Sequence, residues 1–67
     1  MNHYLFECTA EFTIDDFCMF AKDEQFIVEA DDWDSAKRAA NALTAGNYDF
    51  LYMMEGTEAA TSGVEIY

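Results

Sequence analysis

The chain has 67 residues, of which 14 are acidic and three are Lys or Arg, so its formal net charge is -11. A chain of this length forms a single domain, residues 1–67, whose core is too small to frame a large pocket. The surplus of carboxylates excludes direct binding to DNA, RNA or anionic lipid, because phosphate binding requires a surplus of Lys and Arg.

The composition also predicts a folded protein in a reducing cytoplasm. Apolar residues make up 52% of the chain and aromatic residues 16%, whereas disordered acidic segments lack aromatic residues. The longest apolar run, residues 17–21, is far too short to cross a membrane, and no charged-then-apolar leader opens the chain. Two cysteines are too few for a disulfide scaffold, so we expect Cys8 and Cys18 to be free thiols buried among apolar side chains.

The first predicted element is a half-buried strand over residues 3–12. Apolar side chains such as Phe6 and Cys8 alternate there with polar ones, and a period of two indicates a strand with one buried face. Glu7 and Glu11 fall on the face that meets water.

Residues 13–24 allow two predictions. Ile14, Phe17, Cys18 and Ala21 are spaced as one stripe of a helix, which favours a short helix over residues 14–21. The alternative is a strand from Phe17 to Ala21 that turns back through residues 22–25.

The middle of the chain predicts a strand and then the main helix. Residues 25–30 are rich in β-branched and aromatic side chains, and Glu29 lies on their polar face. The following helix covers about residues 32–45, with Asp31 or Asp32 as its N-cap. Its alanines predict close packing against a sheet, and Gly46 is suited to end it.

A third strand is expected over residues 47–55, followed by a turn over 56–63 and a short strand over 64–67 that pairs back on the third strand. The predicted fold class is α+β, an antiparallel sheet of three or four strands with one main helix on one face. The other face is left mostly to solvent, with Leu5 and Ile27 on it.

The acidic residues predict a partner-binding surface. Residues 1–36 carry ten acids and one base, whereas residues 37–67 carry four acids and two bases. Strand residues two apart are separated by ~6.6–6.8 Å, which is close to the spacing of phosphates along a nucleic acid strand. The expected partner-binding residues are Glu7, Glu11, Asp15, Asp16, Asp23, Glu24, Glu29, Asp31 and Asp32. The alternative is an acidic face that only adds solubility, and the aspartates at the helix start also complement the helix dipole.

No catalytic, cofactor-binding or metal-binding motif accompanies this surface. The aspartates of residues 31–34 lack the glycine and the loop length of an EF-hand, and His3, Cys8 and Cys18 do not match the spacing of a zinc site. We therefore expect a protein that is not an enzyme and that needs no cofactor.

The small size, the acidity and the strand–strand–helix–strand order resemble the small phage-encoded anti-CRISPR proteins that mimic nucleic acid. The segment FIVEADDWDSAKRAANAL, residues 26–43, is similar to the strand, acidic cap and alanine-rich helix of such proteins, and the likeness covers residues 4–54 in outline. The resemblance implies a monomer or weak dimer in the cytoplasm of a bacterial host. Its implied partner is a basic nucleic-acid-binding protein, a Cascade-type or Cas9-type CRISPR effector whose DNA-binding or PAM-binding site it occupies.

Two other function classes fit the same sequence. One is a phage structural or assembly accessory protein, or a module that forms homo-oligomers through its sheet. The other is an antitoxin that masks a basic toxin.

Overall fold

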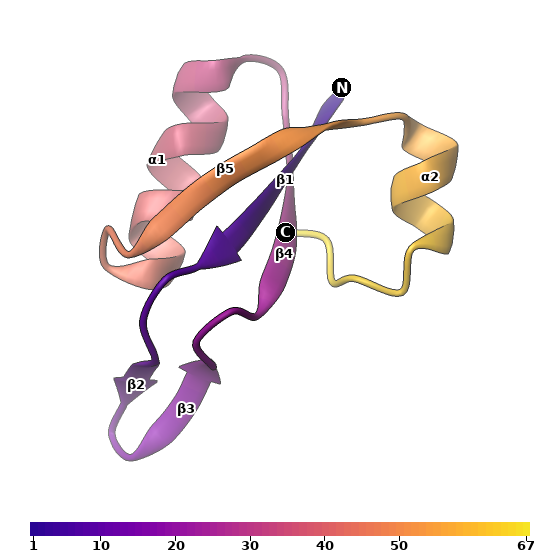
Figure 1. The fold of residues 1–67 in the computed structure, drawn as a ribbon. Coiled ribbons are helices and arrows are strands. Elements are labelled where there is room, and N and C mark those ends of the chain that lie inside the picture. Colours follow the sequence, from indigo (N-terminus) through magenta and orange to yellow (C-terminus); the bar gives the residue numbers. More distant parts are fainter.

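A computed structural model describes residues 1–67. The elements follow in the order β1 (Asn2–Cys8), β2 (Phe12–Ile14), β3 (Phe17–Phe20), β4 (Gln25–Ala30), α1 (Trp33–Thr44), β5 (Tyr48–Met54) and α2 (Gly56–Thr61) (Figure 1). A three-stranded antiparallel sheet has the order β4-β1-β5, and β2 pairs with β3 in a separate two-stranded sheet. The predicted α+β class is confirmed, with α1 as the main helix on one face of the larger sheet.

Strand β1 occupies the centre of the sheet and contributes to a buried cluster on each of its faces. Tyr4, Phe6 and Cys8 belong to the core cluster beneath α1, whereas Leu5 belongs to a second cluster on the opposite face. The predicted alternation is therefore confirmed, but the strand ends at Cys8 rather than at residue 12. The chain leaves the sheet after Cys8, where the Thr9 N–H donates to the Asn47 carbonyl at 3.0 Å.

A bulge in β5 reverses its alternation. Leu5 pairs with Tyr52 and Phe6 pairs with Phe50, which leaves Leu51 as an extra residue in β5. Phe50 therefore lies on the α1 face, where its ring contacts Phe6, while Tyr52 lies on the opposite face with Leu5. The alternation of residues 47–55 predicts one shared face for Tyr48, Phe50, Tyr52 and Met54. This prediction is wrong, because the bulge shifts the register by one residue and divides these side chains between the two faces.

Helix α1 forms over the range that its pattern predicted. Asp32 is the N-cap and accepts a hydrogen bond from the Ser35 N–H at 2.8 Å. Ala36 and Ala40 are fully buried, so their small side chains allow the helix to approach the sheet closely. The left-handed conformation that ends the helix begins at Ala45, one residue before Gly46.

The second face of the sheet is covered at one end, contrary to expectation. Residues 56–61 of the predicted turn form helix α2, and Ala59 packs there against Leu5 and Ile27. The last residues pair in parallel with β4 at Ile27, not with β5, and the C-terminus lies beside β4 in Figure 1. Leu5 and Ile27 are buried as a result.

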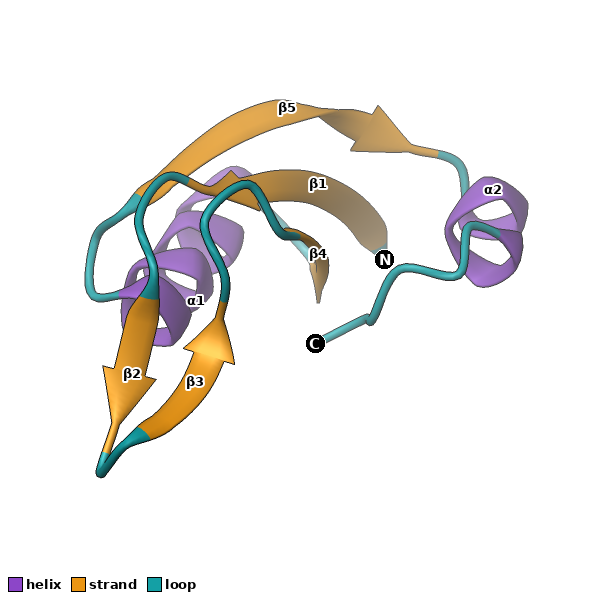
Figure 2. Cartoon of the chain, turned by 60° about the horizontal axis from the view of Figure 1, so that its bottom comes forward, coloured by secondary structure: helices purple, strands orange, loops and turns teal.

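The short helix expected over residues 14–21 is replaced by the β2–β3 hairpin, which projects away from the main sheet (Figure 2). Asp15 and Asp16 form its two-residue turn with φ of 50° and 70°. Short aspartate side chains tolerate this left-handed conformation, and such a turn matches the twist of a hairpin. Phe20 is buried and contacts Phe26, a contact that the predicted helical stripe did not include.

Candidate interaction surface

The acidic side chains lie at the surface almost without internal partners. All 14 are exposed except Glu7, which is half-buried. The structure contains two ion pairs that involve acids, His3 with Glu29 at 2.9 Å and Lys37 with Asp34 at 3.9 Å. Most of the negative charge is therefore free to meet a ligand of opposite charge.

Five of the predicted partner-binding residues lie on and around the β2–β3 hairpin. Asp15 and Asp16 occupy its tip. Near its base, the Asp23 N–H donates to the Cys8 carbonyl at 2.8 Å, and the Cys8 N–H donates to the Glu24 carbonyl at 2.8 Å. These bonds hold the chain after β3 against the end of β1. We call the group the hairpin surface; its acids are Glu11, Asp15, Asp16, Asp23 and Glu24.

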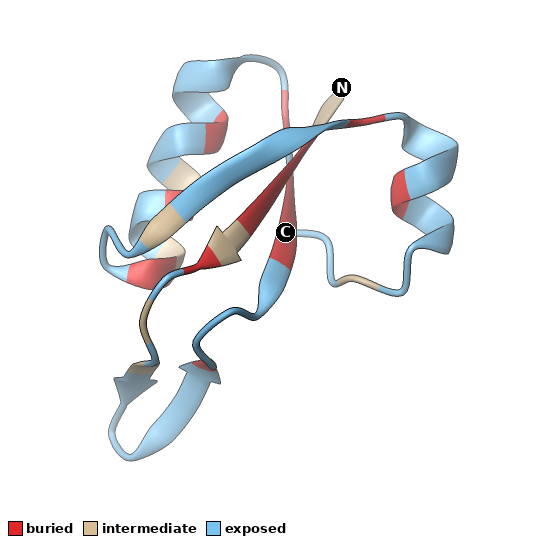
Figure 3. Ribbon diagram, in the orientation of Figure 1, coloured by how far each residue is buried: buried red, intermediate tan, exposed pale blue.

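Apolar side chains lie between these acids. Ile14 pairs with Phe17 across the hairpin, and both are exposed, Phe17 by 73%. Met19 is exposed as well. Figure 3 shows the hairpin as exposed along nearly all of its length, with burial only where it joins the core. The hairpin surface thus carries exposed apolar side chains as well as acids, a mixture that is common in protein interfaces.

Three other predicted residues lie at the far end of β4. Glu29, Asp31 and Asp32 are found where the chain passes from β4 into α1, whereas Glu24 precedes the start of β4. The six residues of β4 span ~17 Å, so the structure does not bring the nine residues together in one patch.

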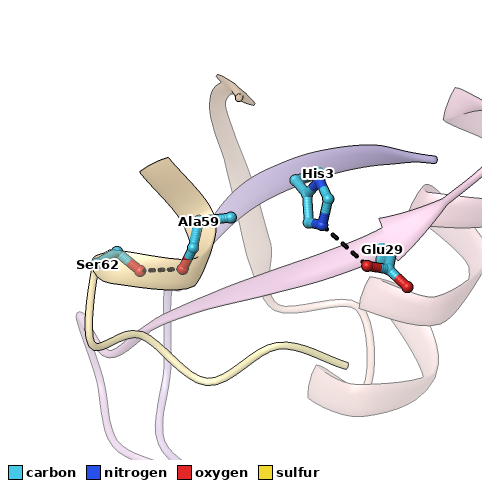
Figure 4. Close-up of polar contacts among 4 residues, drawn as sticks. All are labelled: His3, Glu29, Ala59 and Ser62. Atoms are coloured by element: carbon cyan, nitrogen blue, oxygen red, sulfur yellow. Dashed lines mark hydrogen bonds and ion pairs between the residues drawn. The ribbon is translucent and has the colours of Figure 1, made fainter. Parts of the chain in front are cut away.

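Two of these three acids have partners within the fold. The Glu29 carboxylate contacts Nε2 of His3 on the neighbouring strand β1 (Figure 4). The Asp32 carboxylate caps α1 by accepting a hydrogen bond from the Ser35 N–H, and this bond also lowers the pKa of the Asp32 carboxyl. Asp32 therefore has a structural role that is independent of any partner.

Glu7, the ninth predicted residue, lies directly opposite Asp49 of β5. The two side chains fall on the sheet face away from α1, and neither forms an ion pair. Opposed like charges weaken a strand pair. Asp49 was not among the predicted residues, because only the register of β1 and β5 places it beside Glu7.

The two thiols differ, contrary to the expectation that both are buried. Cys8 is buried and its Sγ donates to the Ala10 carbonyl at 2.9 Å, whereas Cys18 is exposed on the hairpin. Desolvation, followed by the charges of Glu11 and Glu24, raises the pKa of the Cys18 thiol.

A shallow groove beside the start of β5 is lined by Lys37, Arg38, Asn41 and Tyr48. No three His, Cys, Asp or Glu side chains are grouped closely enough to hold a metal ion. Neither helix has the length and apolar character needed to cross a membrane. No protein family, curated protein or solved structure matches this chain.

Proposed function

We propose that this protein is a non-enzymatic inhibitor that occupies a cationic nucleic-acid-binding site on another protein through the hairpin surface. The observation that supports this most directly is the projecting hairpin, which carries the exposed Phe17 together with acids that lack ion-pair partners. In the form implied by the resemblance to anti-CRISPR proteins, the partner is a Cascade-type or Cas9-type effector in the bacterial cytoplasm. DNA binding by that effector is the step that is blocked.

Each part of the hairpin surface has a separate energetic role. Its carboxylates attract an Arg-rich or Lys-rich groove and accelerate association, an effect that weakens as salt screens the charges. Buried carboxylates would add little affinity unless arginines pair with them well. Ile14 and Phe17, which are exposed and paired across the hairpin, supply the burial that holds the complex together, because a large buried side chain dominates the binding energy of an interface.

A purely solubilising role explains this surface less well. A net charge of magnitude about 2–8 is enough for a small domain to stay in solution, and this chain carries -11. A solubilising surface also has no use for a phenylalanine that is 73% exposed. Acids beside an exposed aromatic side chain favour recognition of a partner.

The test measures binding of a labelled, PAM-containing DNA duplex to purified Cascade-type and Cas9-type effectors with their guide RNA. We expect the protein to abolish the gel shift, with less inhibition as salt rises. In the variant Asp15→Asn/Asp16→Asn two charges are lost, but the turn is kept, because asparagine adopts the left-handed conformation readily. Asp34→Asn/Glu58→Gln is the matched control, which loses the same charge outside the hairpin.

The expected order of inhibition tests the choice of binding surface separately from the choice of partner class. The asparagine variant and Phe17→Ala should inhibit weakly, the latter by about 30-fold if Phe17 contributes about 2 kcal/mol as a central contact. The control should inhibit as the parent does. Equal inhibition by all variants would show that the hairpin surface is not the binding site, and no inhibition of either effector would show that the partner class is wrong.

A further inference from the structure

The outer edge of β5 is an unprotected sheet edge. The order β4-β1-β5 leaves two edges, and residues 65–67 pair with β4 and cover one of them. On β5, the consecutive residues Phe50–Met53 are all exposed, Tyr52 by 48% and Met53 by 53%. Proteins commonly protect such an edge with lysine or proline, and β5 contains neither.

We propose that β5 pairs antiparallel with β5 of a second copy of the chain, so that one sheet continues through both molecules. A two-fold axis perpendicular to the sheet, placed near the middle of β5, would bring the start of each β5 beside the end of the other. Asp49, the only charged residue of β5, then lies near the far end of the other strand and not opposite its own copy, so no like charges are opposed along the paired strands. Helix α1 of each copy lies on the same side of the continuous sheet.

Charge complementarity favours a second copy over an unrelated strand. Lys37 and Arg38 line the groove beside Tyr48 at the start of β5. Glu55 directly follows the end of β5, and its side chain makes no capping hydrogen bond to α2. In an antiparallel pair the start of one β5 lies beside the end of the other. Glu55 of each copy therefore approaches the basic groove of the other copy, and the contact occurs twice.

The size of the contact predicts a weak dimer. The exposed apolar residues of β5 offer roughly a few hundred Å² per copy, so the two copies together bury less than the total of about 1,200 Å² at which specific interfaces begin. The bulge at Leu51 also shortens the regular pairing segments. We therefore expect a Kd in the micromolar range or weaker.

Salt should affect this dimer and the proposed inhibition in opposite directions. Two molecules of charge -11 repel each other, and the repulsion reaches across the molecules at about 0.01 M salt, where the screening length is about 30 Å. At about 0.15 M salt the screening length is about 8 Å, so only local contacts remain. The dimer is expected to strengthen over this range, whereas binding to a cationic partner weakens.

The test is sedimentation equilibrium of the full chain over a concentration series at low and at physiological salt. Met53→Lys places a charge at the edge and should abolish the dimer, while far-UV circular dichroism confirms that the monomer is folded. Met19→Lys is the matched control, since Met19 is 49% exposed but lies on the hairpin; this variant should dimerise as the parent does.

A charge exchange tests the groove contact. Glu55→Lys and Arg38→Glu should each weaken the dimer, and the double variant, which has the parent net charge, should restore it. A parent that is monomeric at every concentration at physiological salt would overturn the proposal, as would a Met53→Lys variant that dimerises normally. If the parent is monomeric but Met53→Lys no longer inhibits an effector, the edge accepts a strand from another protein and not a second copy.

Discussion

Phe20 and Phe17 lie three residues apart on β3, yet replacing each with alanine should have very different effects on stability. Phe20 is 2% exposed, and its ring lies 5.0 Å from that of Phe26 and 5.7 Å from that of Tyr67. Phe17 extends into solvent near the tip of the hairpin. The pair therefore compares the anchored base of the hairpin with its free end.

The expected loss for Phe20→Ala is large compared with the stability of the whole domain. Truncating a buried phenylalanine costs about 3–5 kcal/mol, because the transfer energy is lost and a cavity remains. A domain of this length has a free energy of unfolding of about 3–10 kcal/mol. Phe17→Ala should change it by no more than about 0.5 kcal/mol, as is usual for an exposed side chain.

Urea unfolding followed by far-UV circular dichroism and by the fluorescence of the single Trp33 measures both changes. With a slope of about 1 kcal/mol per molar urea, Phe20→Ala should lower the midpoint by about 3 M or more, or leave the chain unfolded without urea. Phe17→Ala should keep the parent midpoint. The assignment of the hairpin base to the core is refuted if Phe20→Ala unfolds within about 1 M of the parent, or if Phe17→Ala destabilises the domain to the same extent.

Three further predictions concern ionisable groups. The pKa of Asp32 is lowered in the folded state, so its contribution to stability is present above the unfolded pKa and is lost as pH falls through the folded value. Thermal melts should show this loss of stability in acid for the parent but not for Asp32→Asn. At neutral pH, Asp32→Ala should have a lower melting temperature than the parent. Desolvation and the contact with Glu65 raise the pKa of Tyr67 to about 12, so the stability of the fold should decrease between pH 10 and 12. Ionisation of Tyr67 should be seen near pH 12 as the difference in 295 nm absorbance between the parent and Tyr67→Phe. A thiol reagent should modify Cys18 but not Cys8 in the folded protein. Because the charges of Glu11 and Glu24 raise the pKa of the Cys18 thiol, the variant Glu11→Gln/Glu24→Gln should react a few-fold faster. An unchanged rate would place both acids away from the thiol.

The elements predicted correctly are those in which only one local pattern is present. Residues 25–30 contain the consecutive apolar residues Phe26, Ile27 and Val28, two of them β-branched, and they form β4 with the predicted bounds. Helix α1 has a capping aspartate before it and alanines at helical spacing within it. Such signals arise from contacts between residues close in the chain, so they can be recognised without the tertiary structure.

Residues 12–20 contain two patterns, and only a distant contact chooses between them. Ile14, Phe17 and Cys18 are spaced for a helix, but the same segment also alternates around a pair of aspartates. The burial of Phe20 against Phe26 and Tyr67 favours the hairpin, because these partners come from β4 and from the chain end. Helix α2 likewise depends on the burial of Ala59 against Leu5 and Ile27.

The sequence alone determined that this protein carries a strongly negative surface, because carboxylates have few cations to pair with and cannot be buried alone. The tertiary structure decided how that charge is distributed over the surface. The length of β4 separates the hairpin acids from those at the start of α1, and the register of β1 with β5 sets Asp49 beside Glu7. The exposed edge of β5 also follows from strand order, which is a long-range property that no local pattern of residues encodes.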